Sequence, residues 1–296
     1  MGEETGEGPI TSPRAIEDYA FSRAQWLIAM DSEIFQAVLD ESGYEAADSR
    51  HPNDAFVFAG YMGKVSDWAN FTHSWKPIID QHPELRDTDF MKALMRWHGG
   101  RSHPLAVDLM KAVTDNNGLG SIRWTLPYRE FRKVVRAREH GLKEHVYFFA
   151  FSAVLFQVLG TVLQAESDAR FDLIYDQNIH EEPRIQEAYQ KYRAIIEKAS
   201  PWLAQRMPLR PQPLTDAEYW PLRAADALAW NTHRHFIRAQ KGRLFTNPLW
   251  RLMDSGPEAF KDTWSEQDVR AVLGTPQNQR EFVIRKLERI FKLTES

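Results

Sequence analysis

The segment from residue 146 to residue 165 carries no charged side chain, and it constrains the fold more than any other part of the chain. About 20 apolar residues can cross a bilayer as a helix, so the segment is either a membrane span or a buried core helix. Gln157, Thr161 and Gln164 recur at helical spacing and place the polar groups on one stripe of an otherwise apolar helix. We therefore predict a core helix and no membrane partner.

Charge and cysteine content exclude several classes of protein. The chain has 37 Lys and Arg against 41 Asp and Glu, a net charge of −4, so it does not coat nucleic acid through its overall charge. Any contact with nucleic acid has to be local. The absence of cysteine excludes disulfide scaffolds, thiolate zinc sites and iron–sulfur clusters, and it is consistent with a reducing, cytoplasmic location, which we predict.

Short apolar runs alternate with amphipathic segments along the rest of the chain. The Phe- and Val-rich runs at 34–39 and 55–61 predict an antiparallel pair of strands joined by a polar loop. Strands interleaved with helices are typical of an α/β fold, in which a mixed sheet is flanked by helices. We also expect strands at 86–91, 122–125 and 171–176, and helices at 66–81, 104–114, 183–199 and 221–237.

Two of the predicted strands end in an aspartate. Asp40 shares its strand face with Val38, whereas Glu41 points to the other face, because side chains alternate along a strand. Asp176 holds the same position at the end of its strand. An aspartate there often only caps a turn. If the two strands are parallel neighbours, however, Asp40 and Asp176 meet beyond the strand ends, where ligands bind in α/β sheets.

A third aspartate lies in an apolar helical stretch. Asp226 is surrounded in sequence by alanines and leucines, which is an expensive place for a charge unless it is paired. Arg223 and Arg234 are the ion-pair partners that the sequence offers.

Three stretches in order carry a family resemblance. Residues 38–43 read VLDESG, residues 174–176 read IYD and residues 222–230 read LRAADALAW. This order resembles domain-of-unknown-function family 3800, a largely bacterial group with a ribonuclease H-like fold and predicted nuclease activity. The resemblance spans about 33–236, and its specificity lies in the order of the three stretches, since each alone is short.

The resemblance implies that Asp40, Asp176 and Asp226 are catalytic metal ligands. Clustered carboxylates repel one another, so they either take up protons or hold cations, and Mg²⁺ or Mn²⁺ suits an all-oxygen site. The implied mechanism is hydrolysis of phosphodiester bonds in DNA or RNA by two ions about 3.5–4 Å apart, bridged by Asp40. The nucleic-acid type is left open.

One departure from the family motivates an alternative function. The family tends to show a His-Met-x-Glu element, whereas residues 89–93 here read DFMKA and have neither the histidine nor the acid. Asp87 or Asp89 could supply the missing carboxylate from a shifted position. Otherwise the chain is a catalytically weak ribonuclease H-like module that binds nucleic acid or a partner protein.

Several other residues are candidates for supporting roles. His233 lies two helical turns after Asp226 on the same face, where it either transfers protons or is an ordinary surface histidine. Glu41 and Asp89 are the other supporting candidates. A basic run contains the candidate residues for binding a nucleic-acid backbone, and Phe131 within that run could stack on a base. The other interpretation is that the run is only a solvent-exposed face of a strand or helix. These basic residues are Arg129, Arg132, Lys133 and Arg136.

The predicted domain organisation has three parts. Residues 1–30 form an acidic tail and a leader helix, and residues 31–240 form the ribonuclease H-like domain. Residues 241–296 form a helical extension packed on that domain, because apolar residues such as Phe260 and Trp264 recur at helical spacing. Whether the chain associates with a second copy of itself or with another protein is left open.

Overall fold

A computed structural model describes residues 34–43, 54–96, 103–135, 143–165, 169–177, 182–243 and 247–273. The predicted leader helix and Arg136 lie outside these residues.

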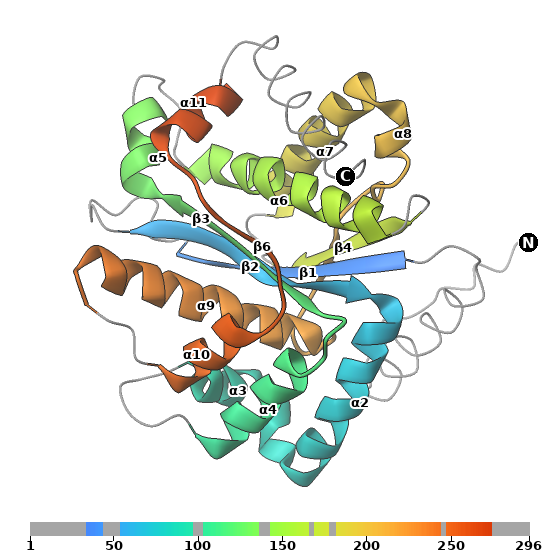
Figure 1. The fold of residues 1–296 in the computed structure, drawn as a ribbon, viewed down its shortest axis with the longest axis vertical. Helices are drawn as coiled ribbons and strands as arrows, with labels where there is room; N and C mark the ends of the chain where they lie inside the picture. The colour runs from blue at the N-terminus through green and yellow to red at the C-terminus, as the bar shows by residue number, and fades with distance from the viewer. Residues whose placement is uncertain are drawn as a thin grey trace, which may run out of the picture.

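The described residues form one six-stranded mixed sheet in the order β5-β4-β1-β2-β3-β6 (Figure 1). β1 and β2 form the predicted antiparallel pair, β2 is antiparallel to β3, and the pairs β1–β4, β4–β5 and β3–β6 are parallel. The predicted α/β class with a mixed sheet is therefore confirmed. The strands are β1 (Ile34–Ser42), β2 (Ala55–Lys64), β3 (Gly120–Pro127), β4 (Arg170–Asp176), β5 (Gln212–Leu214) and β6 (Glu258–Thr263).

Helices cover both faces of the sheet, and each face buries its own apolar core (Figure 1). This explains why β1 and β2 are apolar on both faces rather than alternating. One face carries α5 (Tyr128–Val135), α6 (Lys143–Ala165), α7 (Glu182–Ala199), α8 (Pro201–Ala204) and α11 (Glu266–Leu273). The opposite face carries α2 (Val65–Gln81), α3 (Thr88–Met95), α4 (Pro104–Thr114), α9 (Pro221–Gln240) and α10 (Pro248–Ser255).

The uncharged segment is the predicted core helix. Among the described residues, the stretch Val146–Leu163 of α6 is the one helix long and apolar enough to cross a membrane, and 83% of it is buried inside the protein. Its aromatic side chains pack edge-on against both neighbours, with Phe151 on Phe58 of β2 and on Tyr189 of α7.

The predicted strand at 86–91 is wrong. This stretch contains the end of a short 3₁₀ helix, η2 (Pro83–Arg86), followed by the start of α3. The side chain of Asp87 accepts a hydrogen bond from the Phe90 amide at 2.9 Å and caps α3. Met91 and Met95 are buried four residues apart, which is the spacing of one helical face.

The helical pattern predicted for the C-terminal part holds only in places. Phe260 lies in β6, which pairs with β3 and extends the sheet, so the helix predicted there is wrong. Val269 and Val272 lie in α11 and pack into the core beneath α6, as helical spacing predicts. An apolar spacing of three and four residues can arise by chance across a strand–helix junction, and it did so here.

Candidate functional site

Asp40 and Asp176 are neighbours at the ends of parallel strands. Val38 and Ile174 are register partners, as are Leu39 and Tyr175, so each aspartate follows one residue later on its strand. Val38 and Ile174 belong to the core on the face that α9 covers. Because side chains alternate, Asp40 and Asp176 emerge on that same face, as predicted.

A third parallel strand contributes an acid that sequence reasoning missed. Leu214 of β5 pairs with Asp176, and its carbonyl accepts a hydrogen bond from Gln177 at 2.9 Å. Asp216 follows two residues later and is buried. The adjacent parallel strands β1, β4 and β5 thus each lead into an aspartate. β5 has only three residues, one of them proline, and so gives no strand signal in the sequence.

Asp226 reaches the same place from α9, which packs on β1 and β2. Its charge is paired, but not with the predicted partners, since Arg96 Nη2 lies 2.8 Å from Asp226 Oδ1. Arg223 instead donates to backbone carbonyls, including that of Asp216 at 3.0 Å. Arg234 lies over the ring of Trp230. We call Asp40, Asp176, Asp216 and Asp226 the acid cluster.

The second cation at the acid cluster is Lys92. Its Nζ lies 3.2 Å from Asp216 Oδ2, and its side chain is only 28% exposed. Burial acts to lower the pKa of Lys92, but the four carboxylates of the cluster outweigh it and raise that pKa. Lys92 lies on α3, and Arg96 directly follows the last residue of that helix, with its amide donating to the Lys92 carbonyl at 3.0 Å. The sequence could have revealed this pair had 86–96 been interpreted as helix.

The carboxylates of the cluster disfavour one another's charge. Burial raises the pKa of Asp40 well above its usual range, and the charges of Asp226, Glu41 and Asp176 raise it further. Asp40 is 4% exposed and accepts a hydrogen bond from the Glu41 amide at 2.7 Å. Burial also raises the pKa of Asp176 to about 6; Lys92 opposes this rise, while Asp216 and Asp226 add to it.

Glu41 points away from the cluster. The hydroxyl of Tyr147 on α6 donates to Glu41 Oε1 at 3.1 Å, and α6 covers the sheet face opposite to α9. The alternation along β1 is therefore as predicted. The side chain of Glu41 acts on Asp40 through its charge, while the Glu41 amide donates to Asp40.

His233 lies on the same side of the sheet as Asp226 but contacts other groups. Its Nε2 is 2.9 Å from Asp54 Oδ1, and its Nδ1 is 3.4 Å from the hydroxyl of Ser42. Gly43 beside it has φ +83°, and a Cβ there would clash with the Ala55 carbonyl and with the imidazole. His233 thus ties the end of β1 to the start of β2 beside the acid cluster.

The structure does not bring Asp87 or Asp89 into the cluster. Asp87 caps α3, and Asp89 is exposed in the first turn of that helix. Asp89 is not among the charges that act on Asp40 or Asp176. Asp216, rather than either of these residues, is the fourth acid.

The described part of the basic run lies on α5, on the face of the sheet opposite to the cluster. Phe131 is fully buried, so the expectation that it stacks on a base is wrong. Lys133 pairs with Glu130 at 2.8 Å, and Arg132 lies over the ring of Tyr128. Arg129 is largely exposed and has a long contact to Glu130.

The acid cluster fits a divalent metal ion in its chemistry, although the side chains are not pre-arranged around one. Its donors are all carboxylate oxygens, which hard cations prefer, and the pKa values of Asp40 and Asp176 are raised by burial and by the charges of neighbouring carboxylates. Lys92 and Arg96 already stand among these carboxylates as cations. Within the described ranges, no three His, Cys, Asp or Glu side chains are placed to hold a metal ion together.

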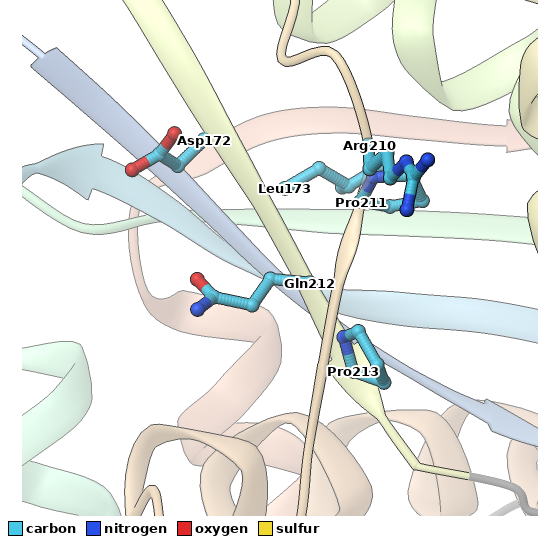
Figure 2. A pocket seen from close by; sticks show the side chains of 6 residues that line it. All are labelled: Asp172, Leu173, Arg210, Pro211, Gln212 and Pro213. Carbon is cyan, nitrogen blue, oxygen red and sulfur yellow. The ribbon is translucent and has the colours of Figure 1, made fainter. Parts of the chain in front are cut away.

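A shallow hollow of about 280 Å³ lies at the β5 edge of the sheet, apart from the cluster. Figure 2 shows that its walls come from β4, from β5 and from the residues just before β5. None of the four clustered aspartates lines it. Its lining residues are Asp172, Leu173, Arg210, Pro211, Gln212 and Pro213.

Comparison with known proteins adds no further assignment: no family model, no curated protein and no solved structure matches this chain. The resemblance to family 3800 therefore rests on the three sequence stretches that contain Asp40, Asp176 and Asp226.

Proposed function

We propose that this protein is a metal-dependent nuclease of the ribonuclease H-like class, related to family 3800, that hydrolyses phosphodiester bonds. The observation that carries the proposal is the convergence of Asp40, Asp176 and Asp226, which are far apart in sequence, at one end of adjacent parallel strands. A mixed sheet with helices on both faces is the architecture that the resemblance implies.

The acids and their neighbours would have distinct roles. Asp40, Asp176 and Asp226 would hold Mg²⁺ or Mn²⁺, which supplies Lewis acidity at the phosphate and lowers the pKa of an attacking water. The ion pair with Arg96 orients Asp226, and the amide of Glu41 fixes one oxygen of Asp40. The apolar core beneath the strand ends keeps water away from the other side of the carboxylates.

Asp40→Asn tests the proposal. We expect this variant to lose at least about 100-fold of the metal-dependent cleavage rate, because it removes the charge of a central ligand without changing the volume. Its fold should be retained or slightly stabilised, since the charge of Asp40 is disfavoured in the native state. Cleavage of single- and double-stranded DNA, RNA and hybrids in Mg²⁺, Mn²⁺ or EDTA is the measurement.

The matched control is Asp89→Asn, an exposed aspartate outside the cluster. It should cleave like the wild type. Undiminished metal-dependent cleavage by folded Asp40→Asn protein would refute the assignment.

A second function, binding without cleavage, is supported by one observation. Lys92 and Arg96 pair with two of the four clustered carboxylates, so part of the negative charge that would attract metal ions is already neutralised. Under this alternative the chain is a weakly active ribonuclease H-like module that binds nucleic acid or a protein. Binding of a nucleic acid with no turnover in either metal would favour it. The cytoplasmic location and the association with a second copy of the chain remain predictions.

A further inference from the structure

The charges around the acid cluster can be counted because the structure identifies both its acids and its cations. Four aspartates act on the charge of Lys92, and two cations contact them, Lys92 of α3 on Asp216 and Arg96, the residue after α3, on Asp226. With every group ionised, the four aspartates and the two cations sum to a charge of −2, and Glu41, which acts on Asp40 through its charge, adds a third surplus negative charge. One divalent ion balances two of these three charges, whereas two ions would exceed them and leave a buried net positive charge.

Both cations are partly buried against the carboxylates that they contact. The side chains of Lys92 and Arg96 are 28% and 34% exposed, and their carboxylate partners are 10% and 9% exposed. Burying a lysine or an arginine to this extent is costly unless the charge is compensated. The end of α3 that precedes Arg96 is also fixed to α9, because the amide of Asn231 donates to the carbonyl of Met95 at 3.4 Å.

We propose that Lys92 and Arg96 take the place of a second metal ion, so that the acid cluster binds one divalent ion per chain. This inference rests on the proposed function, in which the cluster holds a catalytic metal, and it replaces the two-ion arrangement that the resemblance implies. Lys92 Nζ lies 3.2 Å from Asp216 Oδ2, and all four carboxylates of the cluster act on its charge, so Lys92 is the first of the two to be tested.

The test is calorimetric titration of MnCl₂ into the metal-free full-length protein. We expect one ion per wild-type chain. Lys92→Met keeps most of the side-chain length but removes the charge, so it should bind Mn²⁺ roughly 10-fold tighter or take up a second ion, because a repelling charge within a few ångströms is lost. Lys92→Arg restores the charge and should return the binding to one ion.

Lys111→Met is the matched control. Lys111 is an exposed lysine of α4, outside the acid cluster, and its loss should leave Mn²⁺ binding unchanged. Arg96→Met provides a second variant should Lys92→Met not fold, and it should also tighten Mn²⁺ binding.

Thermal unfolding in EDTA gives a readout that is independent of metal binding and of activity. Removing Lys92 takes away one of the two counter-ions of the buried carboxylates, so Lys92→Met should melt several degrees below the Lys111→Met control. Added Mn²⁺ should then raise its melting temperature more than that of the wild type.

The outcomes separate this inference from the proposed function. Two ions bound to the wild type, with cleavage that Asp40→Asn abolishes, would overturn the inference and leave the proposed function in place. Unchanged Mn²⁺ binding in both Lys92→Met and Arg96→Met would do the same. If the wild type bound no Mn²⁺, or if the Asp40→Asn variant bound Mn²⁺ as tightly as the wild type, both the proposed function and the inference would be overturned.

Discussion

Asp176 makes the stability of the metal-free protein depend on pH in an unusual direction. Its pKa is raised from an ordinary value of 3.8 to about 6 in the folded protein, chiefly by burial. Between these two values the folded state binds more protons than the unfolded state, so stability falls as pH rises through this window and is level above it. Asp40, whose pKa is also raised, acts in the same direction.

Asp176→Asn should remove part of this dependence. We measure the melting temperatures of the variant and of the wild type in EDTA from about pH 4 to 7. We expect the melting temperature of the variant to increase relative to that of the wild type as the pH rises. The difference between the two proteins is the informative quantity, because Asp80, Asp254 and Glu266 have lowered pKa values and destabilise the fold at the acid end in both. Asp172→Asn on the same strand is the control. A constant difference across the range would show that Asp176 is not held neutral at low pH.

At the residue scale, the sequence could place Asp40, Asp176 and Glu41 because alternation along a strand is a local rule. The predicted face of each residue agrees with the structure. The partner of Asp226 could not be predicted. Arg96 is 130 positions away in sequence, and no periodicity connects residues brought together only by the packing of α3 on α9.

At the element scale, α3 depends on its cap. The Asp87 side chain accepts a hydrogen bond from the Phe90 amide, and this helix has only eight residues to stabilise it. Asp87→Ala should therefore lower the free energy of unfolding by about 1 kcal/mol, measured as a shift of the midpoint in urea.

Asp89→Ala, two residues further along, removes an exposed acid from the first turn without removing the cap. It should cost only a few tenths of a kcal/mol, from the loss of a favourable interaction with the helix dipole. Equal losses in the two variants would contradict the capping role of Asp87.

Elements with a strong local pattern were predicted well. The buried face of α2 consists of Trp68, Phe71, Trp75 and Ile79, as helical spacing indicates, and the helix continues through Pro77. The two errors, at 86–91 and around Phe260, concern short segments. A short apolar run is compatible with either a strand or a helix, and its neighbours in space decide which one forms.

At the scale of the whole molecule, one sheet joins two apolar cores. Leu109 of α4 is fully buried in the core beneath α9, and Leu155 of α6 is fully buried in the core on the opposite face. Both cores are built on β1 and β2, so neither face can unfold and leave the other with its sheet intact.

Leu109→Ala and Leu155→Ala should each cost about 2–5 kcal/mol and each lower the same single transition. Circular dichroism and tryptophan fluorescence in urea should give coincident midpoints in the wild type and in both variants. Separate transitions, each moved by only one of the two substitutions, would show that the two cores unfold independently.

The sequence by itself determined the fold class, the buried position of α6 and the placement of Asp40 and Asp176 at the ends of strands. Each of these follows from a pattern that repeats within a few residues. Only the tertiary structure decided that Asp216 joins the acids, that Lys92 and Arg96 face them, and that β6 completes the sheet. The physical reason is that the sequence separation between the two members of an ion pair follows no repeat. The partner of a charged group is whichever group the packing of distant helices and strands brings within a few ångströms.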